Sequence, residues 1–205
     1  MKKVICLIFS IGFVLISIVH GFSQEKPRTI DESNPQYNYP NQPVSIVARK
    51  IGDLAFEKNT PVRASKSWLK DVRLTIRNTS SKTLVWLWVE LNIERQGKLS
   101  SQGSIPLQFG NRAAQRDSTG KLVASSLSLR PGETTHLSLS DSSFDYWMKY
   151  LRTHEAEDID RVSLEIRYAH YDDGTGWALG FETRQNPNDL NEYKVVSNPG
   201  GSDGN

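Results

Sequence analysis

Cysteine is almost absent from this chain of 205 residues. The single cysteine, Cys6, lies inside an apolar N-terminal stretch. The rest of the chain therefore has no disulfide, and it has no thiolate for nucleophilic catalysis or zinc binding. These absences exclude disulfide-stapled small domains, so a folded domain in this chain depends on its hydrophobic core for stability.

The sequence also lacks an excess of charge of either sign. Lysine and arginine number 25 against 23 acidic residues, and a cut after Ser23 removes two lysines and no acid, which leaves a neutral chain. A neutral domain gives no electrostatic reason to expect nucleic acid or an anionic membrane as partner. Because we also see no glycine-rich phosphate loop and no strong catalytic signature, we predict no catalytic residue and no cofactor.

One long hydrophobic run, from Val4 to Val19, opens the chain. It follows two lysines and is followed by small residues at the −3 and −1 positions, Gly21 and Ser23, which is the order of a secretory signal peptide. We predict that residues 1–23 are this signal and that the protein is exported, to the periplasm or the extracellular space. The run is shorter than the ~20 residues that span a bilayer as a helix. An uncleaved anchor is the alternative, and it is the only membrane association that we expect.

Two polar segments flank a central domain, which we predict at residues 44–197. Residues 24–43 carry prolines and polar groups with almost no aliphatic side chains. Such a segment cannot bury enough apolar surface to offset its ordering entropy, so we expect a disordered linker there. Residues 198–205 contain the sequence PGGSDGN and are expected to be a disordered tail.

Within the central domain the dominant hydrophobic period is two residues, which indicates half-buried strands. Between residues 70 and 78, apolar and polar side chains alternate, and between 83 and 95 five aliphatic side chains share one face. In a later strand we expect Tyr168 to lie on the same side as Val162, Leu164 and Ile166. Further strands are predicted near residues 44–49, 99–109, 122–129, 134–139 and 177–183, with a last edge strand near 193–196.

One segment departs from this period. Phe144, Trp147, Met148 and Leu151 recur at helical spacing after Asp141, which is a good helix N-cap residue. We therefore predict one helix, at residues 142–153, inserted in an otherwise β-rich domain.

The number and spacing of the strands favour an all-β protein, an antiparallel sandwich. The run from Val72 to Leu84 resembles the region between the second and third strands of immunoglobulin-like and fibronectin-like domains of secreted bacterial proteins. The turn at residues 129–133 (LRPGE) and the hairpin at 173–177 are similar to turns of those domains. The resemblance implies an immunoglobulin-like β-sandwich. The helix and the missing disulfide depart from the antibody pattern.

Trp86 and Trp88 are the most informative aromatic pair. They lie two positions apart on one strand and are expected to point the same way, roughly 7 Å apart. If both indoles are exposed and coplanar, they form a stacking platform for a glycan. Alternatively, the predicted helix covers them and they belong to the core. A third alternative is that they contact a protein partner. We add Tyr171 and Trp177, from the following hairpin, to this candidate binding surface.

Acidic and histidine side chains offer weaker candidates. His170, Asp172 and Asp173 lie near one another in sequence and could bind a metal ion, but two or three ligands do not make a site, and Asp-rich turns are common without metal. We therefore predict no metal site.

We accordingly expect an exported, non-enzymatic β-sandwich that binds a protein or a glycan, or serves as an envelope accessory protein. One alternative is a carbohydrate-binding module that uses the aromatic pair. A second is a secreted hydrolase whose carboxylates come from distant strands, an arrangement that spacing in the sequence does not reveal.

Overall fold

The computed structural model describes residues 25–93, 103–110, 127–155 and 158–197. The predicted signal peptide (1–23) and C-terminal tail (198–205) lie outside these residues. Within them, no helix is long and apolar enough to cross a membrane.

Twelve strands, two short 3-10 helices and one α-helix make up this described part of the chain. In chain order they are β1 (Lys26–Asp31), η1 (Pro35–Tyr37), β2 (Val44–Ile51), β3 (Leu54–Ala55), β4 (Val62–Ala64), η2 (Trp68–Asp71), β5 (Val72–Asn78), β6 (Leu84–Ile93), β7 (Gly103–Gly110), β8 (Thr134–Ser138), α1 (Asp141–Thr153), β9 (Arg161–Tyr171), β10 (Thr175–Ala178), β11 (Phe181–Asn186) and β12 (Asp189–Ser197).

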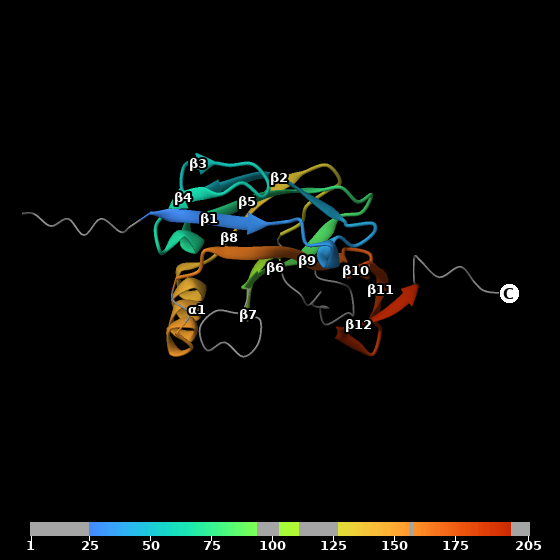
Figure 1. Ribbon diagram of the computed structural model, residues 1–205. Coiled ribbons are helices and arrows are strands. Elements are labelled where there is room, and N and C mark those ends of the chain that lie inside the picture. The colour runs from blue at the N-terminus through green and yellow to red at the C-terminus, as the bar shows by residue number, and fades with distance from the viewer. Residues whose placement is uncertain (1–24, 94–102, 111–126, 156–157, 198–205) are drawn as a thin grey trace, which may run out of the picture.

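The strands form two sheets, which lie one above the other in Figure 1. The small sheet has the order β3-β2-β5-β8, and all its neighbours are antiparallel. The large sheet is built around β9. One edge of β9 pairs with β6, which continues to β7, and the other edge pairs first with β1 and then with β10. From there β10 continues to β11 and β12, and β1 to β4.

A mostly-β fold with two sheets and one helix confirms the coarse prediction from the sequence. One difference is that β1 and β9 run parallel, so the large sheet is mixed rather than purely antiparallel. The aliphatic sides of both sheets meet in one core, where the small sheet contributes Leu74 and Ile76 and the large sheet contributes Leu87 and Leu91, all fully buried.

Strand β1 corrects the expectation of a disordered linker at residues 24–43. Thr29 pairs with Arg161 of β9, and Arg28 pairs with Val62 of β4. Only Ile30 adds a fully buried aliphatic side chain, so the composition resembles that of a spacer although the segment is a strand. Its order comes from partners far along the chain, because backbone pairing and ion pairs replace most of the missing apolar burial.

Ion pairs tie β1 to the segment that precedes β9. The guanidinium of Arg28 contacts Asp158 at 2.7 Å and donates to the backbone oxygen of Ile159 at 2.8 Å. Lys26 pairs with the same Asp158, and Arg161 Nη2 lies 2.7 Å from Asp31 Oδ2. These contacts join residues about 130 positions apart in sequence.

The pKa values of two of these carboxyls make stability depend on pH. A hydrogen bond from Lys26, then one from Arg28, lower the pKa of Asp158, and a hydrogen bond from Ser33, aided by Arg161, lowers that of Asp31. The stability from a lowered pKa is present above the unfolded value of about 4 and is lost as the pH falls through the folded value. Urea unfolding should therefore show a smaller free energy of unfolding at about pH 3 than at about pH 6. Equal values at the two pH values would contradict this assignment.

Helix α1 confirms the predicted helix at 142–153 and begins one residue earlier. Its N-cap is Ser140, whose hydroxyl accepts from the backbone N–H of Ser143 at 3.2 Å, rather than the expected Asp141. Leu151 is fully buried, while Phe144 and Trp147 pack against the core from its border. The helix lies at the opposite end of the molecule from β11 and β12 (Figure 1).

Candidate functional site

Strand β6 presents two chemically different faces. Leu87, Val89, Leu91 and Ile93 point into the core and are fully buried. Trp86, Trp88, Glu90 and Asn92 alternate with them and therefore occupy the outer face of the large sheet. This alternation is the one expected from the sequence.

A β-bulge adds Tyr168 to the same outer face. Trp88 is opposite Tyr168, but the next residue, Val89, is opposite Ile166, so β9 has one extra residue at Arg167. Such a bulge reverses the side to which the following side chains point. The expectation that Tyr168 lies on the same side as Ile166 is therefore wrong, because strict alternation does not anticipate a bulge.

Aromatic rings then form a continuous row across the outer face. The Trp86 ring lies 5.8 Å from that of Trp88, 6.1 Å from that of Tyr168 and 4.5 Å from that of His170. His170 in turn stacks on Tyr193 of β12, with ring centroids 3.5 Å apart and planes 13° apart. Since β10 and β11 lie between β9 and β12 in the sheet order, this contact requires the sheet to curl over its own outer face.

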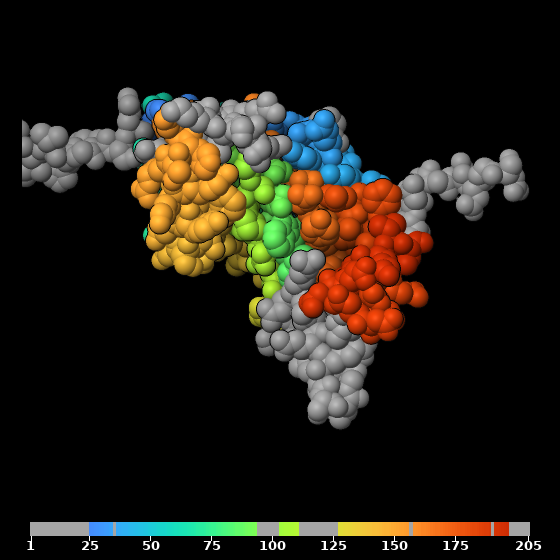
Figure 2. Space-filling view, turned by 90° about the horizontal axis from the view of Figure 1, so that it is seen from below, coloured from blue at the N-terminus to red at the C-terminus, as the bar shows by residue number. Residues whose placement is uncertain are grey.

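The two tryptophans differ in exposure, and the helix is not what covers Trp86. Trp86 is 2 % exposed, and the rings of Trp88, Tyr168 and His170 that lie against it belong to β6 and β9. Trp88 is half-buried. Figure 2 looks at this side of the molecule, with α1 and β12 on opposite sides of β6 and β7. The planes of the two indoles make an angle of 64°, so they form no flat platform.

A cavity of about 560 Å³ opens over this row, and we call it the aromatic cleft. It is lined by Trp86, Trp88, Glu90, Arg167, Tyr168, His170, Ala178, Thr183, Tyr193 and Val195. Its charged groups are a carboxylate and a guanidinium, since Arg167 Nη1 donates to Glu90 Oε2 at 2.9 Å. Trp88 Nε1 donates to the other oxygen of Glu90 at 3.0 Å, which fixes the indole beside this ion pair.

A second carboxylate lies next to the first. Glu165 is directly opposite Glu90 in the β6–β9 pairing, and both are buried. Glu165 accepts from the hydroxyl of Tyr39 at 2.8 Å and from the amide of Asn92 at 3.1 Å. Burial, and then the hydrogen bond to Glu165, raise the pKa of Tyr39 to about 12, so the phenol stays a proton donor. Each of the four carboxylate oxygens of this pair therefore has a donor.

Gly176 provides the space that the row needs at its centre. It is opposite His170 in the β9–β10 pairing. A Cβ atom there would lie 2.6 Å from the hydroxyl of Thr183, 2.8 Å from the carbonyl oxygen of Ala169 and 3.1 Å from the His170 ring. Because those distances are shorter than van der Waals contact, a side chain at this position would displace the ring that joins Trp86 to Tyr193.

Tyr171 and Trp177 do not join Trp86 and Trp88. Both are buried members of the core, at 8 % and 4 % exposure. Trp177 Nε1 donates to the backbone oxygen of Pro40 at 3.2 Å, and its ring lies edge-on to Tyr39 at 6.0 Å. The structure thus divides the four aromatic residues singled out from the sequence between a cleft on the outer face and the core beneath it.

The weak metal candidates are held by other contacts. His170 is buried in the aromatic row, and Asp173 pairs with Lys82 at 2.8 Å. Asp172 is exposed in the turn after β9. Across residues 25–93, 103–110, 127–155 and 158–197, no three His, Cys, Asp or Glu side chains come together as a metal site.

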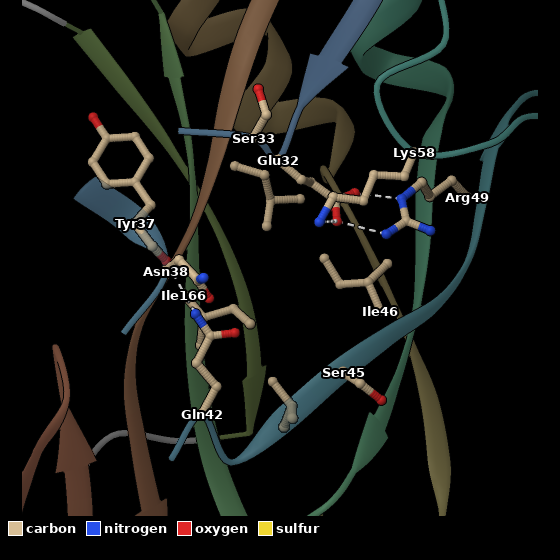
Figure 3. A pocket seen from close by; sticks show the side chains of 12 residues that line it. Glu32, Ser33, Tyr37, Asn38, Gln42, Ser45, Ile46, Arg49, Lys58 and Ile166 are labelled. Atoms are coloured by element: carbon tan, nitrogen blue, oxygen red, sulfur yellow. Dashed lines mark hydrogen bonds and ion pairs between the residues drawn. The ribbon is translucent and has the colours of Figure 1, made fainter. Parts of the chain in front are cut away.

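A second cavity, of about 590 Å³, lies between the two sheets beside β1 and β2 (Figure 3). Val44, Ile46, Leu164 and Ile166 supply its apolar lining. At its rim Arg49 Nη2 donates to Glu32 Oε2 at 2.6 Å, and Lys58 lies further off, at 3.9 Å from the same oxygen. Polar side chains such as Ser33, Asn38 and Gln42 complete its lining, and it has no row of stacked aromatic rings like that of the aromatic cleft.

No protein-family model, no curated protein sequence and no solved structure matches this chain. The candidate site therefore has to be judged on its own geometry. That geometry favours the aromatic cleft, a concave and largely apolar surface with a small number of converging polar groups.

Proposed function

We propose that this protein is an exported, non-enzymatic binding protein of the β-sandwich type, and that the aromatic cleft receives a sugar residue of a glycan. The observation that carries the proposal is the half-buried Trp88 indole held beside the Glu90–Arg167 pair at the cleft. Export rests on the N-terminal pattern of two lysines, an apolar run and small residues before Gln24.

The chemistry of the cleft suits a single sugar ring. The C–H face of a pyranose packs on an indole or phenol, and a carboxylate beside a guanidinium can hydrogen-bond to neighbouring hydroxyls in two directions. A volume of about 560 Å³ falls within the range of small-molecule sites. Because Trp86 is buried and the indoles are 64° apart, a pocket for one ring fits better than a shelf for a long chain.

The arrangement of the two carboxylates supports binding over hydrolysis. A glycosidase needs one carboxylic acid that gives up a proton and one carboxylate that acts as nucleophile or base. Glu90 and Glu165 instead accept hydrogen bonds on every oxygen, from Trp88, Arg167, Tyr39 and Asn92. These contacts hold both side chains in place as hydrogen-bond acceptors that orient neighbouring groups.

An immunoglobulin-like arrangement is part of the proposal. Those domains place their first, second and fifth strands in one sheet and their third, sixth and seventh in the other. The order β2-β5-β8 and the order β6-β9-β10 follow the same chain sequence, with β7 as an added edge strand beside β6. On this assignment α1 lies between the fifth and sixth strands, and β1, β11 and β12 are additions. Of these, β11 and β12 contribute Thr183, Tyr193 and Val195 to the lining of the cleft.

Replacement of Trp88 by alanine tests the cleft directly. We expect Trp88→Ala to weaken binding of the preferred oligosaccharide on the order of 10-fold, because the stacking surface is lost, and Trp88→Phe to weaken it less. Titration calorimetry with chito-, cello- and xylo-oligosaccharides measures this. Tyr146→Ala is the matched control, because Tyr146 is 65 % exposed on α1 and lies outside the cleft.

Two outcomes would overturn the proposal. One is that the unmodified protein binds none of these sugars, or that Tyr146→Ala weakens binding as much as Trp88→Ala. The other is release of reducing ends from the sugars, abolished by Glu90→Gln, which would favour the hydrolase alternative.

A further inference from the structure

The outer face of the small sheet carries cations and no acidic side chain. Strands β2, β5 and β8 read VSIVARKI, VRLTIRN and TTHLS, with no Asp or Glu. In β5 the buried residues alternate with Arg73, Thr75 and Arg77, which therefore point outward. These three strands thus contribute only positive charge to this face, although the overall charge of the chain is close to zero.

The strand register places positive charges of neighbouring strands next to one another. Lys50 of β2 is directly opposite Arg73 of β5, and His136 of β8 is opposite Thr75. Like charges directly opposite each other destabilise an antiparallel pair. The Lys50–Arg73 pair therefore does not stabilise the sheet by charge, and its two cations point to solvent.

The cations of this face also lack the acidic partners that other cations of the fold have. Arg167, Arg161 and Lys82 each lie within 2.9 Å of a carboxylate. Lys50, Arg73 and Arg77 are exposed, and no carboxylate in the part of the chain that the structure describes is at salt-bridge distance from any of them. Their charge is therefore available to an external anion.

Exposed aliphatic side chains lie at the edge of this sheet, where Leu54 is opposite Ile51 in the β2–β3 pairing. Val47, the extra residue of a bulge in β2, is 42 % exposed, and Leu54 of β3 is 54 % exposed. Both line a shallow hollow together with Lys50 and Arg63, and Glu57 at the same hollow is the acidic member. Exposed aliphatic groups beside lysine and arginine are typical of proteins that lie on a lipid surface.

We propose that this face, defined by Lys50, Arg73, Arg77 and His136 with Val47 and Leu54 at its edge, docks on an anionic lipid bilayer. In Figure 1 the small sheet is the upper layer, so its outer face points away from the large sheet and the aromatic cleft. The outward residues of β2, β5 and β8 include no Phe, Tyr or Trp side chain on which a sugar could stack, which favours a lipid headgroup layer over an anionic glycan. The proposal is independent of the ligand in the cleft.

Vesicle co-sedimentation tests the docking. The protein used begins at Gln24, which retains every described element. It should bind vesicles of phosphatidylcholine mixed with phosphatidylglycerol, bind vesicles of phosphatidylcholine alone much more weakly, and be released as salt rises from about 0.05 to 0.5 M. The triple variant Lys50→Gln, Arg73→Gln, Arg77→Gln should bind the anionic vesicles on the order of 100-fold more weakly. Leu54→Ser should weaken binding by a smaller factor of about 3.

A second triple variant changes the net charge equally but elsewhere. Lys149→Gln, Arg152→Gln and Arg184→Gln remove three exposed cations that lie on α1 and β11, and this protein should bind the vesicles almost as the parent does. Equal loss in both triple variants would overturn the proposal, because binding would then follow net charge. So would equal binding to both kinds of vesicle, or binding to soluble dextran sulfate without binding to anionic vesicles. Circular dichroism confirms that each variant is folded.

Discussion

Arg28→Ala is expected to lower the free energy of unfolding by about 3 kcal/mol. The Arg28 side chain is fully buried, contacts Asp158 at 2.7 Å and also pairs with Asp160. It donates in addition to the backbone oxygen of Ile159. Truncation removes all three contacts at once, and it leaves a cavity beside two carboxylates that have lost a buried cation.

Urea unfolding followed by tryptophan fluorescence measures this loss. Lys26→Ala is the matched control, because Lys26 pairs with the same Asp158 but its side chain is 45 % exposed. An exposed pair contributes under about 1 kcal/mol, so the control should remain close to the parent. If the two variants lose the same stability, burial of Arg28 is not what makes its contacts important.

The contacts of Arg28 also show why β1 was missed in the sequence. The segment KPRTID contains a single aliphatic residue, Ile30, and is followed by a segment with three prolines, at positions 35, 40 and 43. Its partners are β4 and residues 158–163. A local sequence pattern does not predict contacts between residues that lie so far apart in the chain. Local hydrophobic period predicts a strand that buries one apolar face, and β1 is instead held by backbone pairing and charge.

Strands with a strong apolar face could be predicted from the sequence, because their pattern is local. In β5 and β6 the aliphatic core side chains recur every second residue, and in α1 the apolar side chains recur at the helical spacing. Each pattern specifies both the element and the side that faces the core. Prediction failed where the backbone departs from the regular period, as at the bulge that turns Tyr168 outward.

In the aromatic cleft, too, the residues of a single strand could be predicted, whereas those brought in by other strands could not. Trp86, Trp88 and Glu90 could be placed on one face, because they alternate within a single strand. Tyr193 reaches the cleft only because the large sheet curls until β12 lies over β9, and Arg167 reaches Glu90 through strand pairing. Sheet curl and the register between distant strands are set by packing of the whole domain, which one strand's sequence does not encode.

Trp68→Ala is expected to cost about 3–5 kcal/mol of unfolding free energy, the largest effect among these variants. Trp68 lies in η2, is 0 % exposed, and is the largest fully buried side chain. Its indole Nε1 donates at 2.7 Å to the backbone oxygen of Ile159, the same oxygen that accepts from Arg28. Replacement by alanine therefore leaves a large cavity in the core. It also removes the hydrogen bond that holds the segment between α1 and β9 to η2.

Trp68→Phe separates packing from hydrogen bonding at this position. It keeps most of the buried ring and removes only the N–H donor, so it should lose about 1 kcal/mol beyond the small change in volume. Trp147→Ala is the matched tryptophan control, because Trp147 is half-buried on α1 and borders the core, and its loss should be well below that of Trp68→Ala. A Trp147→Ala loss as large as that of Trp68→Ala would mean that the core is centred nearer the helix than the burial of η2 indicates.

The double variant Arg28→Ala, Trp68→Phe tests the shared acceptor. The Ile159 oxygen then loses both of its donors, so the loss of unfolding free energy should exceed the sum of the losses in the two single variants.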